Sequence, residues 1–204
     1  MSPTPFELVL ASANPHKAGE IVAVLGPLVE PRVVIRPRPE SIGDIDETGE
    51  SFEQNAELKA RAIAAAVGVA AIADDSGLEV DALGGAPGVR SARYAGEGAT
   101  DQANVAKLLA ALAGHEDRAA RFRAAVVVAF PDGRMLSTSG SVEGRIAEEP
   151  HGESGFGYDP VFIPTGSTRS FGELDEDEKH AQSHRGTALR ALAPLLLAEI
   201  EGSQ

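Results

Sequence analysis

Short apolar runs alternate with helical patterns in the first half of this chain, and this alternation limits the possible folds more than any other feature. Residues 6–11 (FELVLA) predict a buried strand, and the helix after it has Asn14 as its expected N-cap and Pro15 at its first position. Residues 32–36 form another short apolar run. Helices and strands in alternation predict an α/β protein.

The middle of the chain continues the same pattern. Ser51 and Gln54 have the spacing of a capping box and open an alanine-rich helix. The runs AAIAD and LEVDAL predict a strand on each side of a turn at residues 74–77, and Thr100 is expected to cap the next helix. This region therefore adds two helices and two strands to the predicted fold.

The second half of the chain contains a hairpin signal. Residues 121–130 and 134–147 predict two strands, and the turn sequence Pro-Asp-Gly at residues 131–133 separates them. Residues 160–164 (PVFIP) predict a short strand, and residues 183–200 an apolar final helix. Since a hairpin is antiparallel, the sheet is expected to be mixed, with helices flanking it.

Composition limits the class of protein. A length of 204 residues suits a single domain spanning 1–204, and no apolar run approaches the roughly 18 residues of a membrane span. The start of the chain lacks a secretory signal pattern and there are no cysteines, so a soluble protein of the reducing cytoplasm is expected. A net charge of -13 argues against broad nucleic-acid binding, but a small phosphorylated ligand stays possible.

Two adjacent aspartates, Asp74 and Asp75, follow the apolar run AIA at an expected strand end. Unpaired carboxylates are costly to bury, so either a bound cation or an acidic turn should explain them. Carboxylate oxygens suit Mg²⁺, and a nucleotide-bound Mg²⁺ typically needs one or two protein carboxylates. Glu47 or Glu50 in the preceding acidic loop could supply the second carboxylate.

Residues 12–17 (SANPHK) lie between the first strand and the first helix. A helix N-terminus offers N–H groups and a positive dipole end, so Lys17 in the first turn would strengthen a phosphate site. A capped surface helix with an incidental lysine is the alternative. The Walker A pattern GxxxxGK[ST] is absent from the chain.

Two segments near the C-terminus could contact a ligand. The glycine-rich loop HGESGFGYDP contains Phe156 and Tyr158, either of which offers a flat face for a base, although a plain flexible loop is equally compatible with the pattern. In SHRG, His184 and Arg185 could donate hydrogen bonds to a carbonyl or phosphate. Alternatively, Ser183 is an N-cap with two solvated neighbours.

Five ordered motifs together resemble the inosine triphosphate pyrophosphatase family, over about residues 8–192. The motifs are SANPHK, ETGESFEQNAELKA, IADDSGLEVDALGGAPGVRSARYAG, GFGYDPVF and EKHAQSHRG. Departures are few: Ala13 replaces the more usual glycine, and His180 and Gln182 differ from the expected residues before SHRG.

The resemblance implies a cytoplasmic house-cleaning enzyme that hydrolyses ITP, dITP and XTP to the monophosphate and pyrophosphate with Mg²⁺. It implies a homodimer of elongated α/β subunits, each a mixed central sheet flanked by helices, with two lobes and a cleft between them. Asp75 is the implied catalytic base, and Glu47 and Asp75 the implied metal ligands. The implied substrate-binding residues are Ser12, Ala13, Asn14, Pro15, His16, Lys17, Ser76, Phe156, Gly157, Tyr158, Asp159, Lys179, His184 and Arg185.

These residues suggest a mechanism. Water would attack the α-phosphorus with Asp75 as base, while Lys17 and Lys179 stabilise the departing pyrophosphate. Lys59 is a further candidate for this stabilising role. Donors from Arg185 or His184 would donate hydrogen bonds to the oxygen at position 6 of hypoxanthine or xanthine. They would meet the amino group of adenine donor to donor and so reject it. Two other readings are a Maf-like pyrophosphatase for modified pyrimidine nucleotides and a nucleotide-binding module without catalysis.

Overall fold

The computed structural model describes residues 4–202, and it divides into two compact units, each with its own apolar core. Within the described range, the first unit comprises residues 4–75, 124–140 and 185–202. The second unit comprises residues 76–123 and 141–184. The expectation of a single domain with two lobes stays a prediction.

One mixed sheet of six strands has the order β2-β1-β3-β4-β5-β6. The strands are β1 (Phe6–Leu10), β2 (Val33–Arg36), β3 (Ala70–Val80), β4 (Ala119–Ala129), β5 (Met135–Ile146) and β6 (Phe162–Pro164). β1 pairs in parallel with β2 and β3, whereas β5 and β6 are antiparallel. The predicted mixed α/β sheet is therefore confirmed.

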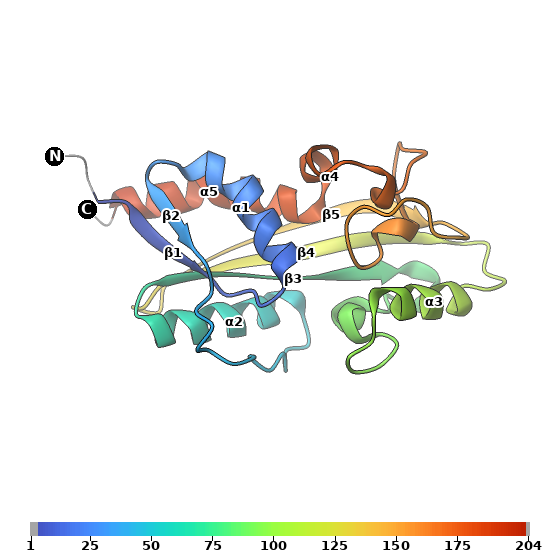
Figure 1. Cartoon of the computed structure of the whole chain (residues 1–204), viewed down its shortest axis with the longest axis horizontal. Coiled ribbons are helices and arrows are strands. Elements are labelled where there is room, and N and C mark those ends of the chain that lie inside the picture. The colour runs from blue at the N-terminus through green and yellow to red at the C-terminus, as the bar shows by residue number, and fades with distance from the viewer. Residues whose placement is uncertain (1–3, 203–204) are drawn as a thin grey trace. The chain divides into compact units, whose positions relative to one another are not determined.

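Three helices cover the sheet in the first unit. They are α1 (Pro15–Val29), α2 (Phe52–Val67) and α5 (His184–Gly202). Figure 1 shows α1 and α5 on one face of the strands and α2 on the other. Leu25 and Leu189 from the helices on the first face pack with Leu8, Ile72 and Val126 of the strands, and all five are fully buried. This core fixes the positions of the helix ends that carry the candidate site.

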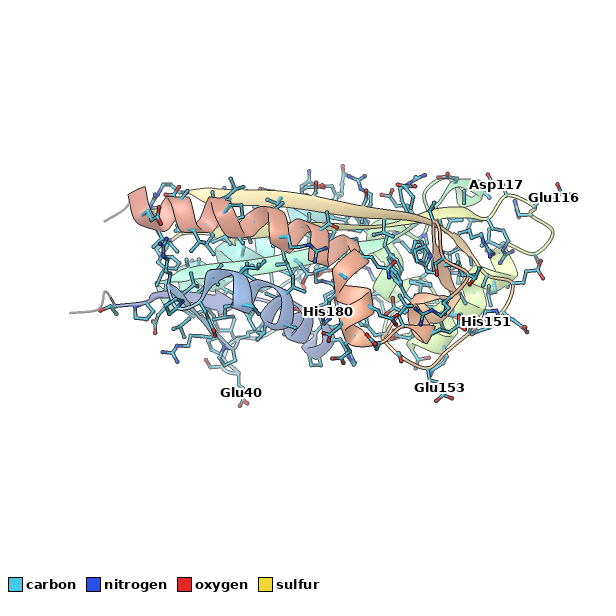
Figure 2. All side chains as sticks on the ribbon, turned by 90° about the horizontal axis from the view of Figure 1, so that it is seen from above. Glu40, Glu116, Asp117, His151, Glu153 and His180 are labelled. Carbon is cyan, nitrogen blue, oxygen red and sulfur yellow. The ribbon has the colours of Figure 1, made fainter. Side chains whose placement is uncertain are left out.

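The second unit has an aromatic core. Its helices are α3 (Asp101–Ala111) and α4 (Glu176–Gln182), and its short 3-10 turns are η1 (Asp81–Leu83), η2 (Gly88–Arg93), η3 (Asp159–Val161) and η4 (Phe171–Glu173). The rings of Phe122 and Phe162 lie 4.6 Å apart, and both contact Phe171. Figure 2 shows Glu116 and Asp117 extending from the loop after α3.

Helix starts were predicted well because their signals are local. The side chains of Asn14, Ser51 and Thr100 all accept N-cap hydrogen bonds as expected. The capping box at Ser51 is only half formed, since the Gln54 side chain accepts from the N–H of Glu50 instead. Helix α4 was not predicted, although the capping box of Asp175 and Glu178 marks its start.

The predicted turn between two strands at residues 74–77 is wrong. Residues 70–80 form one continuous strand, β3, with Asp74 and Asp75 in its middle and nearly inaccessible to solvent. The sequence suggested a turn because buried carboxylates need partners, and those partners come from distant parts of the chain. Over residues 4–202, no helix is both long enough and apolar enough to cross a membrane.

Candidate active site

The centre of the candidate site lies where β3 extends beyond the end of β1. β1 ends at Leu10, which pairs with Ile72, and α1 begins shortly afterwards. Lys17 in the first turn of α1 places its Nζ 3.7 Å from Asp74 Oδ2 and 3.7 Å from Asp75 Oδ1. Successive side chains of a strand point to opposite faces, so a cation beside the strand edge can reach both carboxylates.

Asp75 lies among groups from α2. Asn55 Nδ2 donates to its Oδ2 at 3.2 Å, and Lys59 Nζ lies 3.4 Å from its Oδ1. Asn55 and Lys59 are four residues apart, which places both side chains on one helix face. Burial raises the pKa of Asp75 above its ordinary value, against the opposing effect of Lys59 and Lys17. A raised pKa makes this carboxylate a better proton acceptor than an exposed aspartate.

Asp74 has a different environment. Arg185 donates from Nε to Asp74 Oδ2 at 2.8 Å, and the same guanidinium also pairs with Glu20 of α1. Burial alone would raise the pKa of Asp74, but Arg185, Lys17 and Lys59 together lower it well below its ordinary value. Asp74 therefore stays charged beside Arg185, and Asp75 as the proton acceptor remains a prediction.

Arg185 is 1% exposed and engaged with two carboxylates of the first unit. Its role as a base-reading donor stays a prediction. Sequence reasoning missed Glu20, since nothing in the local pattern separates a buried glutamate of α1 from a solvated one. Its partner lies 165 residues further along the chain.

The predicted N-cap of α1, Asn14, already uses two of the first backbone N–H groups of the helix. Asn14 Oδ1 accepts from the N–H groups of His16 at 2.9 Å and of Lys17 at 3.2 Å, while the N–H of Asn14 donates to Ser12 Oγ at 3.2 Å. The expectation that the first N–H groups of this helix are open to a ligand is thus wrong for those two groups, because the N-cap itself uses them. Ala13, like His16, is exposed.

A single ammonium group joins the two carboxylates that were expected to hold a metal. Lys59 Nζ lies 2.6 Å from Glu47 Oε1 in addition to its contact with Asp75. Glu50, the other candidate, is exposed. Among residues 4–202 no group of three or more His, Cys, Asp or Glu side chains could hold a metal. Two carboxylate oxygens within reach of one cation do fit Mg²⁺ that takes its other ligands from phosphate and water.

The glycine-rich loop of the second unit holds a buried ion pair. Lys179 Nζ lies 2.6 Å from Asp159 Oδ2 and 4.6 Å from the centre of the Phe156 ring. Asp159 Oδ2 also accepts from the N–H of Phe156 at 2.9 Å. Lys179, expected near the pyrophosphate with Lys17, is therefore in a different unit from Lys17 and beside an aromatic ring.

Of the two aromatic candidates for stacking on a base, the structure favours Phe156. Tyr158 is buried in the core of the second unit, and its hydroxyl donates to the carbonyl of Ser91 at 2.9 Å. Burial raises the pKa of Tyr158. This side chain holds the loop in place, so the expectation that it could offer a flat face is wrong.

The remaining predicted residues are also placed. His184 is 5% exposed and stacks on Phe122, with ring centres 4.8 Å apart and planes within 10° of parallel. Ser76 is half-buried in β3. The first unit thus brings together Lys17, Glu47, Lys59, Asp74, Asp75 and Arg185. The second unit brings together Phe156, Gly157, Tyr158, Asp159 and Lys179.

Known proteins match this chain over nearly its whole length. The sequence model of the Ham1 family matches residues 8–195. A dITP/XTP pyrophosphatase of Bacillus subtilis (strain 168) is 49% identical over 197 residues, which cover 94% of this chain and 98% of that protein. A dITP/XTP pyrophosphatase of Streptomyces coelicolor is 46% identical over 192 residues, covering 93% of this chain and 96% of the relative.

Solved structures are similar throughout the chain. A HAM1 protein from Coxiella burnetii has a TM-score of 0.86 and 43% identity, covering 95% of this chain and 99% of its own. A nucleoside-triphosphatase / dITP/XTP pyrophosphatase from Mycobacterium abscessus has a TM-score of 0.74 and 44% identity, covering 94% and 100%.

Proposed function

The chain belongs to the Ham1 family, and from this premise we propose that it hydrolyses the non-canonical purine triphosphates ITP, dITP and XTP to the monophosphate and pyrophosphate. The observation that carries the proposal is the buried Asp75, in contact with Lys17 and Lys59 and joined through Lys59 to Glu47. A site that only bound nucleotides would not need a positioned carboxylate base among lysines.

The proton acceptor in this proposal is Asp75. Its raised pKa makes the carboxylate a better acceptor for a proton of the attacking water, and the hydrogen bond from Asn55 holds the carboxylate in place. Attack is assigned to the α-phosphorus: water forms a bond to it, its bond to the bridging oxygen of the β-phosphate breaks, and pyrophosphate leaves as the monophosphate forms. Asp74, tied to Arg185 and close to Lys17, supports the same region through its charge and is not a base.

The polyphosphate is assigned to Lys17. Its ammonium is half-buried between two carboxylates, which hold it at the start of α1. A cation fixed there stabilises negative charge on the departing pyrophosphate without reorganising first. Lys59 is the second ammonium of this region, and its contacts with Glu47 and Asp75 keep both carboxylates in position.

We assign a magnesium ion to Glu47 and Asp75. Their oxygens are hard donors, and both lie within hydrogen-bonding distance of one cationic group, the ammonium of Lys59. When bound, the ion would neutralise phosphate charge and lower the pKa of the attacking water.

Phe156 is assigned as the stacking face for the purine base, and Lys179 lies beside that ring. Donors in this region would satisfy an oxygen at position 6 of the purine but would meet the amino group of adenine donor to donor. ATP is therefore expected to be a poor substrate. The cellular role that fits is removal of damaged nucleotides from the precursor pool, by a cytoplasmic homodimer.

The decisive experiment measures turnover of ITP, XTP, GTP, ATP and dUTP with Mg²⁺ and separates the phosphate products. We expect ITP and XTP to be preferred and pyrophosphate to be released. Orthophosphate as the product would place attack at the γ-phosphorus and refute the mechanism. Preference for dUTP would refute the substrate assignment in favour of a Maf-like activity.

A further inference from the structure

Two carboxylates, one in the loop of residues 155–159 and one at the start of α3, accept hydrogen bonds from the backbone on both sides of Phe156. The N–H of Phe156 donates to Asp159 Oδ2 at 2.9 Å. The next N–H, that of Gly157, donates to Asp101 Oδ2 at 2.7 Å. These two groups belong to the peptide planes immediately before and after the Phe156 Cα. Fixing both planes fixes the direction in which the side chain leaves the backbone.

The two carboxylates are not equivalent. Asp159 belongs to the loop itself and is held by Lys179 at 2.6 Å. Asp101 is the first residue of α3 and lies 56 residues before Gly157 in the sequence. Its hydrogen bond from the Gly157 N–H ties the peptide plane after Phe156 to that helix. Gly157 has a φ of +63°, a left-handed conformation that a glycine adopts without strain, so without an external hydrogen bond this plane would rotate easily.

We propose that Asp101 is a positioning residue for base recognition. It holds the peptide plane after Phe156, and thereby aims the ring that stacks on the purine, without touching the substrate itself. This inference deepens the proposed function and rests on it for the role of Phe156. The bond between Asp101 and Gly157 is a separate claim, and it can be tested without any nucleotide.

The test variant is Asp101→Ala, and the matched control is Thr100→Ala. Thr100 Oγ1 caps the same turn of α3 by accepting from the N–H of Ala103 at 3.2 Å. The control therefore weakens the start of α3 and leaves the Asp101 carboxylate in place. Asp101→Asn keeps an oxygen acceptor at the same position and should restore most of the lost function.

For Asp101→Ala we expect the KM for ITP to rise about tenfold, as for loss of a hydrogen bond to a charged acceptor, with kcat changed by less than about twofold. Thr100→Ala should lower stability but leave KM unchanged, and Asp101→Asn should return KM toward the wild-type value. Equal changes of KM in the two alanine variants would show a general effect of α3 and overturn the proposal.

Amide hydrogen exchange of the free protein gives an independent readout. The Gly157 amide should exchange faster by about tenfold or more in Asp101→Ala than in Thr100→Ala, because only the first variant removes its acceptor. Unchanged exchange at Gly157 in Asp101→Ala would refute the anchoring bond. If the wild type failed to cleave ITP, the proposed function would fall while this measurement still decided whether Asp101 holds the loop.

Discussion

Replacing Asp74 with asparagine should destabilise the protein strongly, although the two side chains have nearly the same shape. Asp74 is 1% exposed, and Arg185, also 1% exposed, donates to it at 2.8 Å. The change removes the negative charge of the buried Asp74–Arg185 pair. The guanidinium of Arg185 then keeps its ion pair with Glu20. Breaking a buried ion pair typically costs about 3–5 kcal/mol, and the remaining carboxylate places the expected loss near about 3 kcal/mol.

The chain supplies a control with the same geometry at the surface. Arg61 Nε lies 2.8 Å from Glu57 Oε1 on α2, but the two side chains are 51% and 41% exposed. An exposed pair of this spacing contributes only about 0.3–0.5 kcal/mol, so Glu57→Gln should be nearly neutral. The distance between the paired atoms is the same in both pairs, so a difference between the variants cannot come from that distance.

Urea unfolding would give the free energy of unfolding of both variants and thermal unfolding their Tm, each followed by circular dichroism. For a chain of this length, a loss of about 3 kcal/mol should lower Tm by roughly 6–12 °C. Glu57→Gln should shift Tm by less than about 2 °C. If the two variants lost the same free energy of unfolding, within about 0.5 kcal/mol, burial would not be what makes the Asp74–Arg185 pair important, and the reasoning would be refuted.

Three further predictions concern the site. Asp75→Asn should lower kcat by roughly 10²–10⁴-fold through loss of the base while far-UV circular dichroism stays unchanged, and near-normal kcat would place the base elsewhere. Tyr158→Phe should lower the free energy of unfolding by about 1 kcal/mol, measured in urea, through loss of the bond to Ser91, whereas an unchanged value would mean that this bond does not stabilise the loop. Removing divalent ions with EDTA should abolish ITP turnover and added Mg²⁺ should restore it; full activity in EDTA would contradict the metal assignment.

The features that the sequence determined are those whose causes lie within a few residues. Asn14 caps α1 through the N–H groups of the next residues, and Thr100 caps α3 in the same way. The Pro-Asp-Gly turn at residues 131–133 places β4 and β5 as successive strands of a hairpin, which made the mixed sheet predictable. These local signals were enough for the class of fold and for most element boundaries.

The tertiary structure decided what happens to the charges. Asp74 lies buried in the middle of β3, where Arg185, 111 residues away in sequence, supplies the opposite charge. Likewise, Tyr158 is a core residue and not an open stacking face because its hydroxyl finds the carbonyl of Ser91, 67 residues earlier. A buried charge or polar group is stable only with a partner, and which distant residue becomes that partner is settled by packing of the whole chain.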